Sequence, residues 1–269
     1  MKKLNMSETC MEGKGRFVPK GGQGIKADDR HLLLRDELLQ LFKDRPMTDE
    51  ELLTNWGLYA RSSVLATMLF RVEVYQKILS IPGNIFIFGL WWGQDAVLFE
   101  NIRAILEPYN LNRKIIGFDT FTGYPREDIG KNDKESEVIS EGVYGVTENY
   151  EDYLKKLSTY HLNENTLYKP NAMEFVKGDV MDTIPRYFEA HPENITALAY
   201  FDMALYEPTK VCLEYILKTC VKGSVIVFDE LNRQEYPGET LALKQLIDLN
   251  HAHIEKSSVL PDRTFLIIE

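Results

Sequence analysis

The chain has 269 residues, enough to bury a substantial hydrophobic core in one domain without disulfides or structural metals. Acidic residues outnumber basic ones by 41 to 31, and this acidic balance excludes nucleic acid as a main partner, because phosphate binding depends on lysine and arginine. With 44% hydrophobic and 27% charged residues, the composition is that of an ordinary globular protein rather than a disordered or fibrous one.

Three cysteines, Cys10, Cys212 and Cys220, form no CxxC pair, so the sequence suggests neither a disulfide framework nor a cysteine zinc site. Cys212 and Cys220 lie in an apolar helical pattern and are expected to be buried there. No stretch resembles the apolar part of a signal peptide, and none approaches the ~20 apolar residues that span a bilayer. We therefore expect a cytoplasmic protein with no membrane partner.

The first part of the ordered chain is predicted to be helical. Residues 31–42 and 58–78 place apolar side chains at helical spacing. Between them, Thr48 or Asp49 follows a proline and can accept from the free backbone N–H groups of a short helix. These segments predict an N-terminal helical cap.

From residue 83 onward, short apolar runs bounded by Gly, Asp and Pro alternate with helical segments, which is typical of an α/β fold. Five runs have the length of buried parallel strands, at 84–88, 114–118, 173–177, 197–201 and 224–228. Helices are expected at 95–106, 183–190, 208–220 and 239–250, and a closing antiparallel pair at 251–257 and 263–268. The sequence predicts a seven-stranded, mostly parallel sheet with helices on both faces.

One segment breaks this alternation. Residues 125–170 are rich in Asp, Glu, Lys, Asn and Tyr, with one amphipathic helix expected at 149–157, and they are too long for an ordinary connection after the second strand. By its length, such an insert is either a functional lid or disordered. The predicted organisation is a flexible N-terminus (1–29), a helical cap (30–82) and an α/β domain (83–269) that contains the insert.

The turn after the first strand is a candidate ligand site, because ligands bind at the carboxyl ends of the strands in an open parallel sheet. This turn contains Gly89, Trp91 and Gly93, and glycine lets the backbone approach a ligand closely. The spacing is not the GxGxxG of a dinucleotide fingerprint. A purely structural strand-to-helix turn fits the same residues equally well.

Acids follow the second and third strands. Asp119 ends the second strand, where a carboxylate can accept from both hydroxyls of a ribose, although it could instead cap the next helix. Gly178, Asp179 and Val180 follow the third strand, where a backbone N–H or the Asp179 carboxylate could bind an adenine amino group. An N-cap role for Asp179 is the alternative.

Three further acids follow the fourth and fifth strands. Asp202 ends the fourth, and Asp229 and Glu230 end the fifth. Because adjacent strand ends lie about 5 Å apart, the sequence predicts that these carboxylates converge on one divalent cation, Mg²⁺ or Mn²⁺. Such a cation would lower the pKa of a substrate hydroxyl and orient it for attack.

Taken together, six segments resemble, in order and spacing, the class I methyltransferases of the macrocin O-methyltransferase type, and within them the calicheamicin orsellinate methyltransferases. The segments are IIGFDTFTGYP, FVKGDV, IPRYF, ALAYFDMALYEPTK, GSVIVFDEL and YPGE. The resemblance implies a Rossmann-like fold and S-adenosylmethionine as cofactor. It places the cofactor against Phe88, Gly89, Trp91, Gly93, Asp119, Thr120, Gly178, Asp179, Val180 and Asp202, and the metal on Asp202, Asp229 and Glu230.

The resemblance also implies the reaction, which is methylation of a hydroxyl to give a methyl ether. The expected acceptor is a sugar, most simply one linked to a nucleotide, and Asp202 is the candidate general base. A homodimer is expected. Four residues could contact the acceptor or be structural: Tyr124, Tyr206, Glu207 and Glu239.

Three positions depart from the family pattern. Ile87 stands where an acid often contacts the methionine amine, Ala204 replaces a second acid after the fourth strand, and Glu230 replaces an aspartate. These departures keep a catalytically silent homologue open as an alternative. Methylation of an aromatic hydroxyl is a second alternative, and a nicotinamide-dependent oxidoreductase, disfavoured by the missing GxGxxG, is a third.

Overall fold

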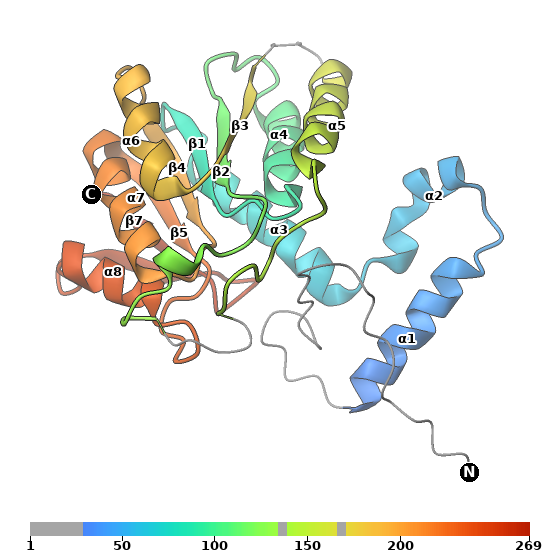
Figure 1. The fold of residues 1–269 in the computed structure, drawn as a ribbon. Helices are drawn as coiled ribbons and strands as arrows, with labels where there is room; N and C mark the ends of the chain where they lie inside the picture. The colour runs from blue at the N-terminus through green and yellow to red at the C-terminus, as the bar shows by residue number, and fades with distance from the viewer. Residues whose placement is uncertain (1–28, 134–138, 166–170) are drawn as a thin grey trace.

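The computed structural model describes residues 29–133, 139–165 and 171–269, and these residues form an α/β fold around one seven-stranded sheet (Figure 1). The strand order is β3-β2-β1-β4-β5-β7-β6. Strands β1 to β5 pair in parallel, whereas β7 runs antiparallel to both β5 and β6. The strands are β1 (Asn84–Phe88), β2 (Ile115–Asp119), β3 (Met173–Lys177), β4 (Thr196–Phe201), β5 (Cys220–Phe228), β6 (His253–Lys256) and β7 (Thr264–Ile267).

Helices cover both faces of the sheet. The described helices are α1 (Asp29–Lys43), α2 (Asp49–Asn55), η1 (Trp56–Tyr59), α3 (Ser62–Lys77), α4 (Gln94–Leu106), η2 (Arg126–Asp128), α5 (Tyr150–Glu164), α6 (Val180–Ala190), α7 (Tyr206–Thr219) and α8 (Gly238–Leu246). Each face of the sheet has its own hydrophobic core, and alternate side chains of β1 belong to different cores. Ile87 packs with side chains of α3, α4 and α5, whereas Phe88 packs with those of α6, α7 and α8. This alternation follows from the two-residue period of a strand.

Helix α3 belongs to the α/β body rather than to a separate cap. Its Phe70, Val74 and Tyr75 are fully buried in the same cluster as strand residues. The remainder of the predicted cap, α1, α2 and η1, extends away from the body in Figure 1, and none of the described side chains between 30 and 59 is buried. The Thr48 cap is confirmed, because its hydroxyl accepts from the Glu51 N–H within a capping box.

The predicted strands are confirmed, with differences at their ends. Strand β5 begins at Cys220, four residues earlier than predicted, so Cys220 lies in the sheet and not at the end of a helix. Buried Cys212 lies on α7, as predicted. In the insert, α5 extends to Glu164, and η2 precedes it. Within the described ranges, no helix is long and apolar enough to cross a membrane.

Candidate active site

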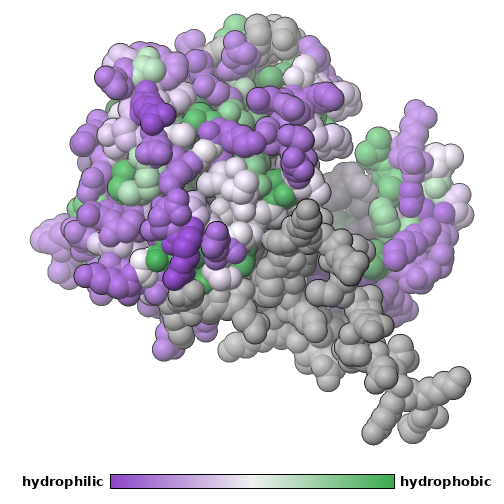
Figure 2. Space-filling view, viewed as in Figure 1, coloured by the Kyte–Doolittle hydropathy of each residue, from purple (hydrophilic) through white to green (hydrophobic). Residues whose placement is uncertain are grey.

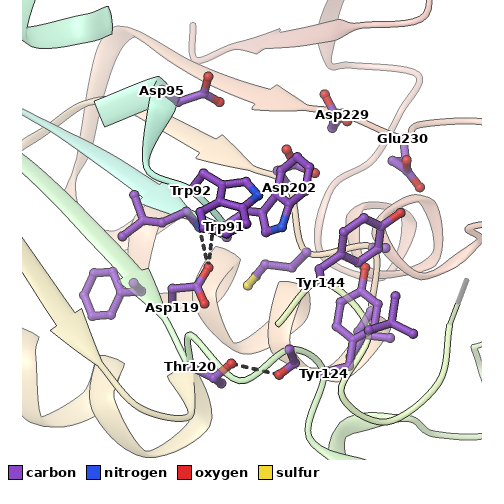
Figure 3. Close-up of a pocket in the computed structure, with 18 of the residues that line it drawn as sticks. Trp91, Trp92, Asp95, Asp119, Thr120, Tyr124, Tyr144, Asp202, Asp229 and Glu230 are labelled. Carbon is purple, nitrogen blue, oxygen red and sulfur yellow. Dashed lines mark hydrogen bonds between the residues drawn. The ribbon is translucent and has the colours of Figure 1, made fainter. Parts of the chain in front are cut away.

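A cavity of about 450 Å³ lies at the carboxyl ends of the parallel strands (Figure 3). Its lining comes from the turns after five strands, from the N-terminal half of α3 and from the insert. One residue from each of several elements illustrates this: Thr67, Gly89, Asp119, Tyr144 and Asp202. Since all five parallel strands end at this edge, the sheet topology brings these distant segments together.

The turn after β1 needs its glycines for steric reasons. Gly89 has φ +90°, and a Cβ at this position would overlap the carbonyl oxygen of Asp202. Gly93 has φ +74° and precedes α4, where a Cβ would overlap the side chain of Leu154. Trp91 also adopts a positive φ, of 48°. The turn is therefore held tightly between the end of β4 and the insert, and its residues 89–92 line the cavity.

We expect Gly89→Ala to lower both stability and cofactor affinity, because the added methyl must displace the backbone that follows β4. Strain of this kind costs about 1–3 kcal/mol of unfolding free energy. Gly57→Ala is the matched control, since no atom of the described residues lies within 4 Å of the added methyl there. Urea unfolding of the two variants measures the difference, and equal stability would contradict this account of the turn.

Asp119 braces this turn. Its Oδ2 accepts from the N–H groups of Leu90 (2.7 Å) and Trp91 (2.8 Å), and its Oδ1 accepts from Phe121 N–H (2.6 Å), as the dashed lines of Figure 3 show in part. Burial raises the pKa of Asp119, and the three backbone donors lower it. A carboxylate accepts about four hydrogen bonds, so roughly one position remains for a ribose hydroxyl. Asp119 does not cap a helix.

The predicted adenine contacts divide into two groups. Gly178 and Val180 line the cavity. Asp179 does not line it, because its side chain caps α6 by accepting from Met181 N–H at 2.7 Å. The N-cap alternative for Asp179 therefore holds.

The other predicted cofactor contacts also divide. Trp91 and Thr120 line the cavity, whereas Phe88 and Gly93 do not. Phe88 is fully buried against the layer of α6, α7 and α8.

Asp128, which the sequence pattern did not single out, is the acid at this end of the cavity. It lies on η2 of the insert, is 8% exposed, and lines the cavity together with Gly178 and Val180. Burial, followed by the charge of Asp179, raises the pKa of Asp128 to about 7. No motif surrounds it in sequence, and its role becomes visible only when the insert folds over the sheet edge.

The three acids after β4 and β5 have different surroundings. Asp202 lines the cavity, and burial, followed by the charge of Asp229, raises its pKa well above the usual range. Asp229 is 2% exposed, forms an ion pair with Arg263 and accepts from the Tyr200 hydroxyl at 3.2 Å. Burial raises the pKa of Glu230 to about 9, and none of the described residues donates a hydrogen bond to its buried Oε2.

This arrangement differs from the predicted three-carboxylate cation site. The positive partner of Asp229 is Arg263, whose Nη1 also donates to the Asp229 carbonyl oxygen at 2.8 Å. In Figure 3 the carboxylates of Asp229 and Glu230 point in different directions. Within the described part of the chain, no group of three or more His, Cys, Asp or Glu side chains could hold a metal ion. The described geometry therefore does not fit a cation held by all three acids.

Aromatic side chains surround the part of the cavity beyond Asp202. Tyr124, a predicted acceptor contact, lines it and packs edge-to-face on Tyr144, with ring centroids 5.6 Å apart. The Tyr144 hydroxyl is hydrogen-bonded to that of Tyr236, which also lines the cavity. Burial raises the pKa of all three phenols, so they stay neutral hydrogen-bonding groups at physiological pH. Tyr144 carries no sequence signal that would have identified it, whereas Tyr236 begins the YPGE segment but was not singled out there as a site residue.

The other predicted acceptor contacts lie outside the cavity lining. Tyr206 bonds Gln245 through its hydroxyl, and Glu207 is exposed on the first turn of α7. Glu239 is fully buried and accepts from the backbone N–H groups of Ala204 (3.3 Å) and Glu230 (3.1 Å). It thus ties together the loops after β4 and β5. Burial raises the pKa of Glu239 to about 8, although these backbone donors favour its charged form.

Comparison with known families decides the reaction class. Residues 67–245, more than half of the chain, match the family model described as Macrocin-O-methyltransferase (TylF). The chain belongs to this family. It is therefore an O-methyltransferase, and the resemblance based on the strand-end motifs is confirmed. A search of curated proteins finds no significant match.

Solved structures agree with this family assignment. The crystal structure of CalS11, a calicheamicin methyltransferase, is 34% identical and covers 90% of this chain and 94% of that chain, with a TM-score of 0.86. An apo structure of CalS11, described as a TDP-rhamnose 3'-O-methyltransferase, is 32% identical over 90% of this chain and 96% of that chain, with a TM-score of 0.78. The O-methyltransferase NovP is 19% identical over 76% and 79%, with a TM-score of 0.59, and shares the fold.

Proposed function

We propose that this O-methyltransferase transfers the methyl group of S-adenosylmethionine to a hydroxyl of a nucleotide-linked sugar. The observation that carries the proposal is the continuity of the cavity, which joins the glycine turn and Asp119 to Asp202 and the tyrosines. A cofactor bound at the turn would present its sulfonium methyl toward Asp202. An acceptor among the tyrosines would reach the same point from the other side.

The cofactor would lie along the strand ends. Its adenine would occupy the end formed by Asp128, Gly178 and Val180, and its ribose would meet Asp119. The methionine part would follow the backbone of Gly89 to Trp92. This order matches the order of strands β3, β2 and β1 across the sheet.

The proposed reaction needs the two substrates to be aligned and one group to take up a proton. The oxygen of the sugar hydroxyl would form a bond to the methyl carbon as the carbon–sulfur bond breaks, and the hydroxyl proton would pass to Asp202. The products are the methyl ether and S-adenosylhomocysteine. Holding both reactants in line in a site with little water supplies much of the acceleration, so no covalent enzyme intermediate is required.

The sugar is favoured over a phenol by the relative's description and by the lining of the acceptor side. The 32% identical neighbour is described as acting on a TDP-rhamnose. Neutral phenols at Tyr124, Tyr144 and Tyr236 offer hydroxyls to hydrogen-bond a polyol, and their rings offer faces on which a sugar can pack. An aromatic acceptor remains the second candidate, because the same rings could stack on it.

The test is methyl transfer from isotopically labelled S-adenosylmethionine to a panel of nucleotide sugars, free sugars and phenols. We expect labelled methyl ether with a nucleotide sugar. Transfer only to phenols would favour the aromatic alternative, and cofactor binding without transfer to any acceptor would favour a silent homologue. Binding of a nicotinamide nucleotide in place of S-adenosylhomocysteine would overturn the proposal.

Metal assistance remains a prediction beyond this proposal. Asp202 and Glu230 face the cavity, but Asp229 would have to exchange Arg263 for the cation. Turnover measured with and without a chelator, and again after addition of Mg²⁺ or Mn²⁺, shows whether a cation assists the reaction. Full turnover in the chelator would leave Asp202 as the sole activating group.

We also propose that the homodimer expected from the sequence forms through the arm of α1, α2 and η1. Leu33, Leu53 and Leu58 there are 69%, 78% and 67% exposed, and Figure 2 shows apolar surface on this lobe. A standard interface uses about 20–30 residues of each partner, a number that an arm of this length can supply. Sedimentation velocity of the full chain tests this, and a monomer at micromolar concentration would contradict it.

A further inference from the structure

A buried ion pair forms part of the cavity wall beside the glycine turn. Arg71 of α3 donates from Nε to Asp95 Oδ1 at 2.9 Å and from Nη2 to Asp95 Oδ2 at 2.8 Å. The two side chains are only 6% and 13% exposed, and both line the cavity. Asp95 lies two residues after Gly93, on the first turn of α4, so the pair lies next to the turn that would hold the cofactor.

The orientation of Arg71 is fixed. Its guanidinium carbon lies 5.0 Å from the ring centroid of Tyr200 and 5.3 Å from that of Phe70. A two-point hydrogen bond to a carboxylate, combined with contacts to aromatic rings, holds the planar group in one position. The pair therefore presents its remaining hydrogen-bonding positions to the cavity in a fixed geometry.

Both Arg71 and Asp95 have hydrogen-bonding positions that the ion pair does not use. A guanidinium has about five N–H donors. Within the described part of the chain, Arg71 directs one of them to each Asp95 oxygen and one, at 3.3 Å, to the Thr67 carbonyl oxygen. Each Asp95 oxygen accepts one of these bonds, and an ionised carboxylate oxygen can accept a second. A positive group and a negative group thus lie side by side, and each can bind one more partner of opposite charge.

Strand β1 provides no charge for this purpose. The side chain of Ile87 is fully buried in the apolar core under α3 and α4. A charged end of a ligand lying along the Gly89 to Trp92 backbone therefore finds no charged partner on β1, and the nearest positive group of the described lining on α3 is Arg71. Arg71 and Asp95 are the buried, oppositely charged pair that the lining places there.

We propose that Arg71 and Asp95 form a clamp for the amino-acid end of the cofactor, with Arg71 donating to the α-carboxylate and Asp95 accepting from the α-ammonium group. The inference rests on the proposed use of S-adenosylmethionine. An amino-acid zwitterion carries both charges about as close together as the pair does, so each buried charge gains a partner. A tie between α3 and α4 alone would not require a charged pair, because apolar side chains serve that purpose with less desolvation.

The test compares two ligands that differ only in the amino-acid end. S-adenosylhomocysteine has it, whereas 5'-methylthioadenosine keeps the nucleoside and sulfur and lacks it. Calorimetry should show that Arg71→Met weakens binding of S-adenosylhomocysteine roughly 10- to 100-fold, as expected for loss of a hydrogen bond between charged groups. Binding of 5'-methylthioadenosine should change less than about threefold, which also shows that the variant is folded.

Asp95→Asn provides the second arm. This variant should bind S-adenosylhomocysteine more weakly than the unaltered protein does. It should bind the deaminated analogue, which retains the carboxylate, with nearly the same affinity as the unaltered protein. Arg103→Met is the control, because Arg103 forms a similarly buried pair with Glu100 on α4 but does not line the cavity. It should lower stability without changing the ratio of the two ligand affinities.

The outcomes separate the clamp from the proposed function. If the unaltered protein binds neither ligand, the cofactor assignment itself fails. If it binds both, and the Arg71 and Asp95 variants lose equal affinity for the two ligands or lose none, the pair is a structural tie and the clamp is wrong.

Discussion

Replacing Asp202 with asparagine is expected to lower turnover by roughly 100- to 10,000-fold, the range that a positioned general base contributes. Asparagine has nearly the same shape, so the close contact between the Asp202 backbone and Gly89 is retained. Affinity for S-adenosylhomocysteine should therefore change much less than turnover. The measurement is the single-turnover rate of methyl transfer with the acceptor found in the panel assay, together with calorimetry.

The pH dependence of the same variant separates proton transfer from a merely steric effect. Burial, followed by the charge of Asp229, raises the pKa of Asp202, and a carboxylate accepts a proton only when it is ionised. In the unaltered protein the rate should rise with pH through this raised pKa, above the range of an ordinary aspartate. In Asp202→Asn the rate should not show this rise with pH. Asp36→Asn, an exposed position on α1, is the control and should keep both rate and profile.

Unchanged turnover in Asp202→Asn would remove Asp202 from the mechanism. The candidate would then be Glu230, which lines the cavity and whose Oε2 has no hydrogen-bond partner among the described residues. Because burial raises its pKa to about 9, Glu230 would accept a proton only at alkaline pH, and the rate should then rise in that range. Ala204 cannot replace either of them, because it has no polar side chain and is 4% exposed.

The central strands are predictable from sequence because they are buried on both faces. Apolar runs such as 84–88 and 197–201 are too short for a buried helix and have the length of a buried strand, and the strands observed there agree with the prediction to within one residue. The start of β5 was not located correctly, because Cys220 and Val221 continue the apolar spacing of α7 and only the pairing of Cys220 with β4 decides the conformation there. Local pattern and long-range pairing compete at such boundaries.

The site was predictable only where it depends on strand ends. The positions of Asp119 and Asp202 in the cavity lining follow from topology alone, whereas their roles stay predictions. The structure adds what each strand-end acid contacts: Asp119 braces a turn, Asp179 caps α6, and Asp229 pairs with an arginine 34 residues later in the chain. A strand-end position specifies where a carboxylate lies, whereas its partners come from segments that are distant in sequence.

Residues outside the strand ends gave no signal. Asp128 and Tyr144 come from the insert, and Arg71 comes from a helix predicted to be part of a cap. Their sequence surroundings contain no motif, and each reaches the cavity only through the packing of its element over the sheet edge. Such residues can be identified only after the fold is known.

Arg263→Met is expected to lower the free energy of unfolding by about 3–5 kcal/mol, because it removes the partner of a buried charge. Asp229 is 2% exposed and its side chain lies between Arg263 and Tyr200. Arg263 also donates to the Asp229 carbonyl oxygen at 2.8 Å, so the variant loses a backbone contact as well. Urea unfolding measures the change. Arg233→Met, in an exposed pair with Asp262, is the control and should cost at most about 1 kcal/mol.

Two further measurements assign the cost to the unpaired charge. Adding Asp229→Asn to Arg263→Met should recover much of the loss, since the buried group is then neutral. The sign of the pH effect follows from burial, which raises the pKa of Asp229, and from Arg263, which lowers it. Without Arg263 the folded-state pKa lies further above the unfolded value of about 4, so the variant's deficit should shrink as the pH falls toward that value and grow as it rises. A deficit that is independent of pH and persists in the double variant would show instead that Arg263 stabilises the β5–β7 edge through packing, and that Asp229 is free to bind another cation.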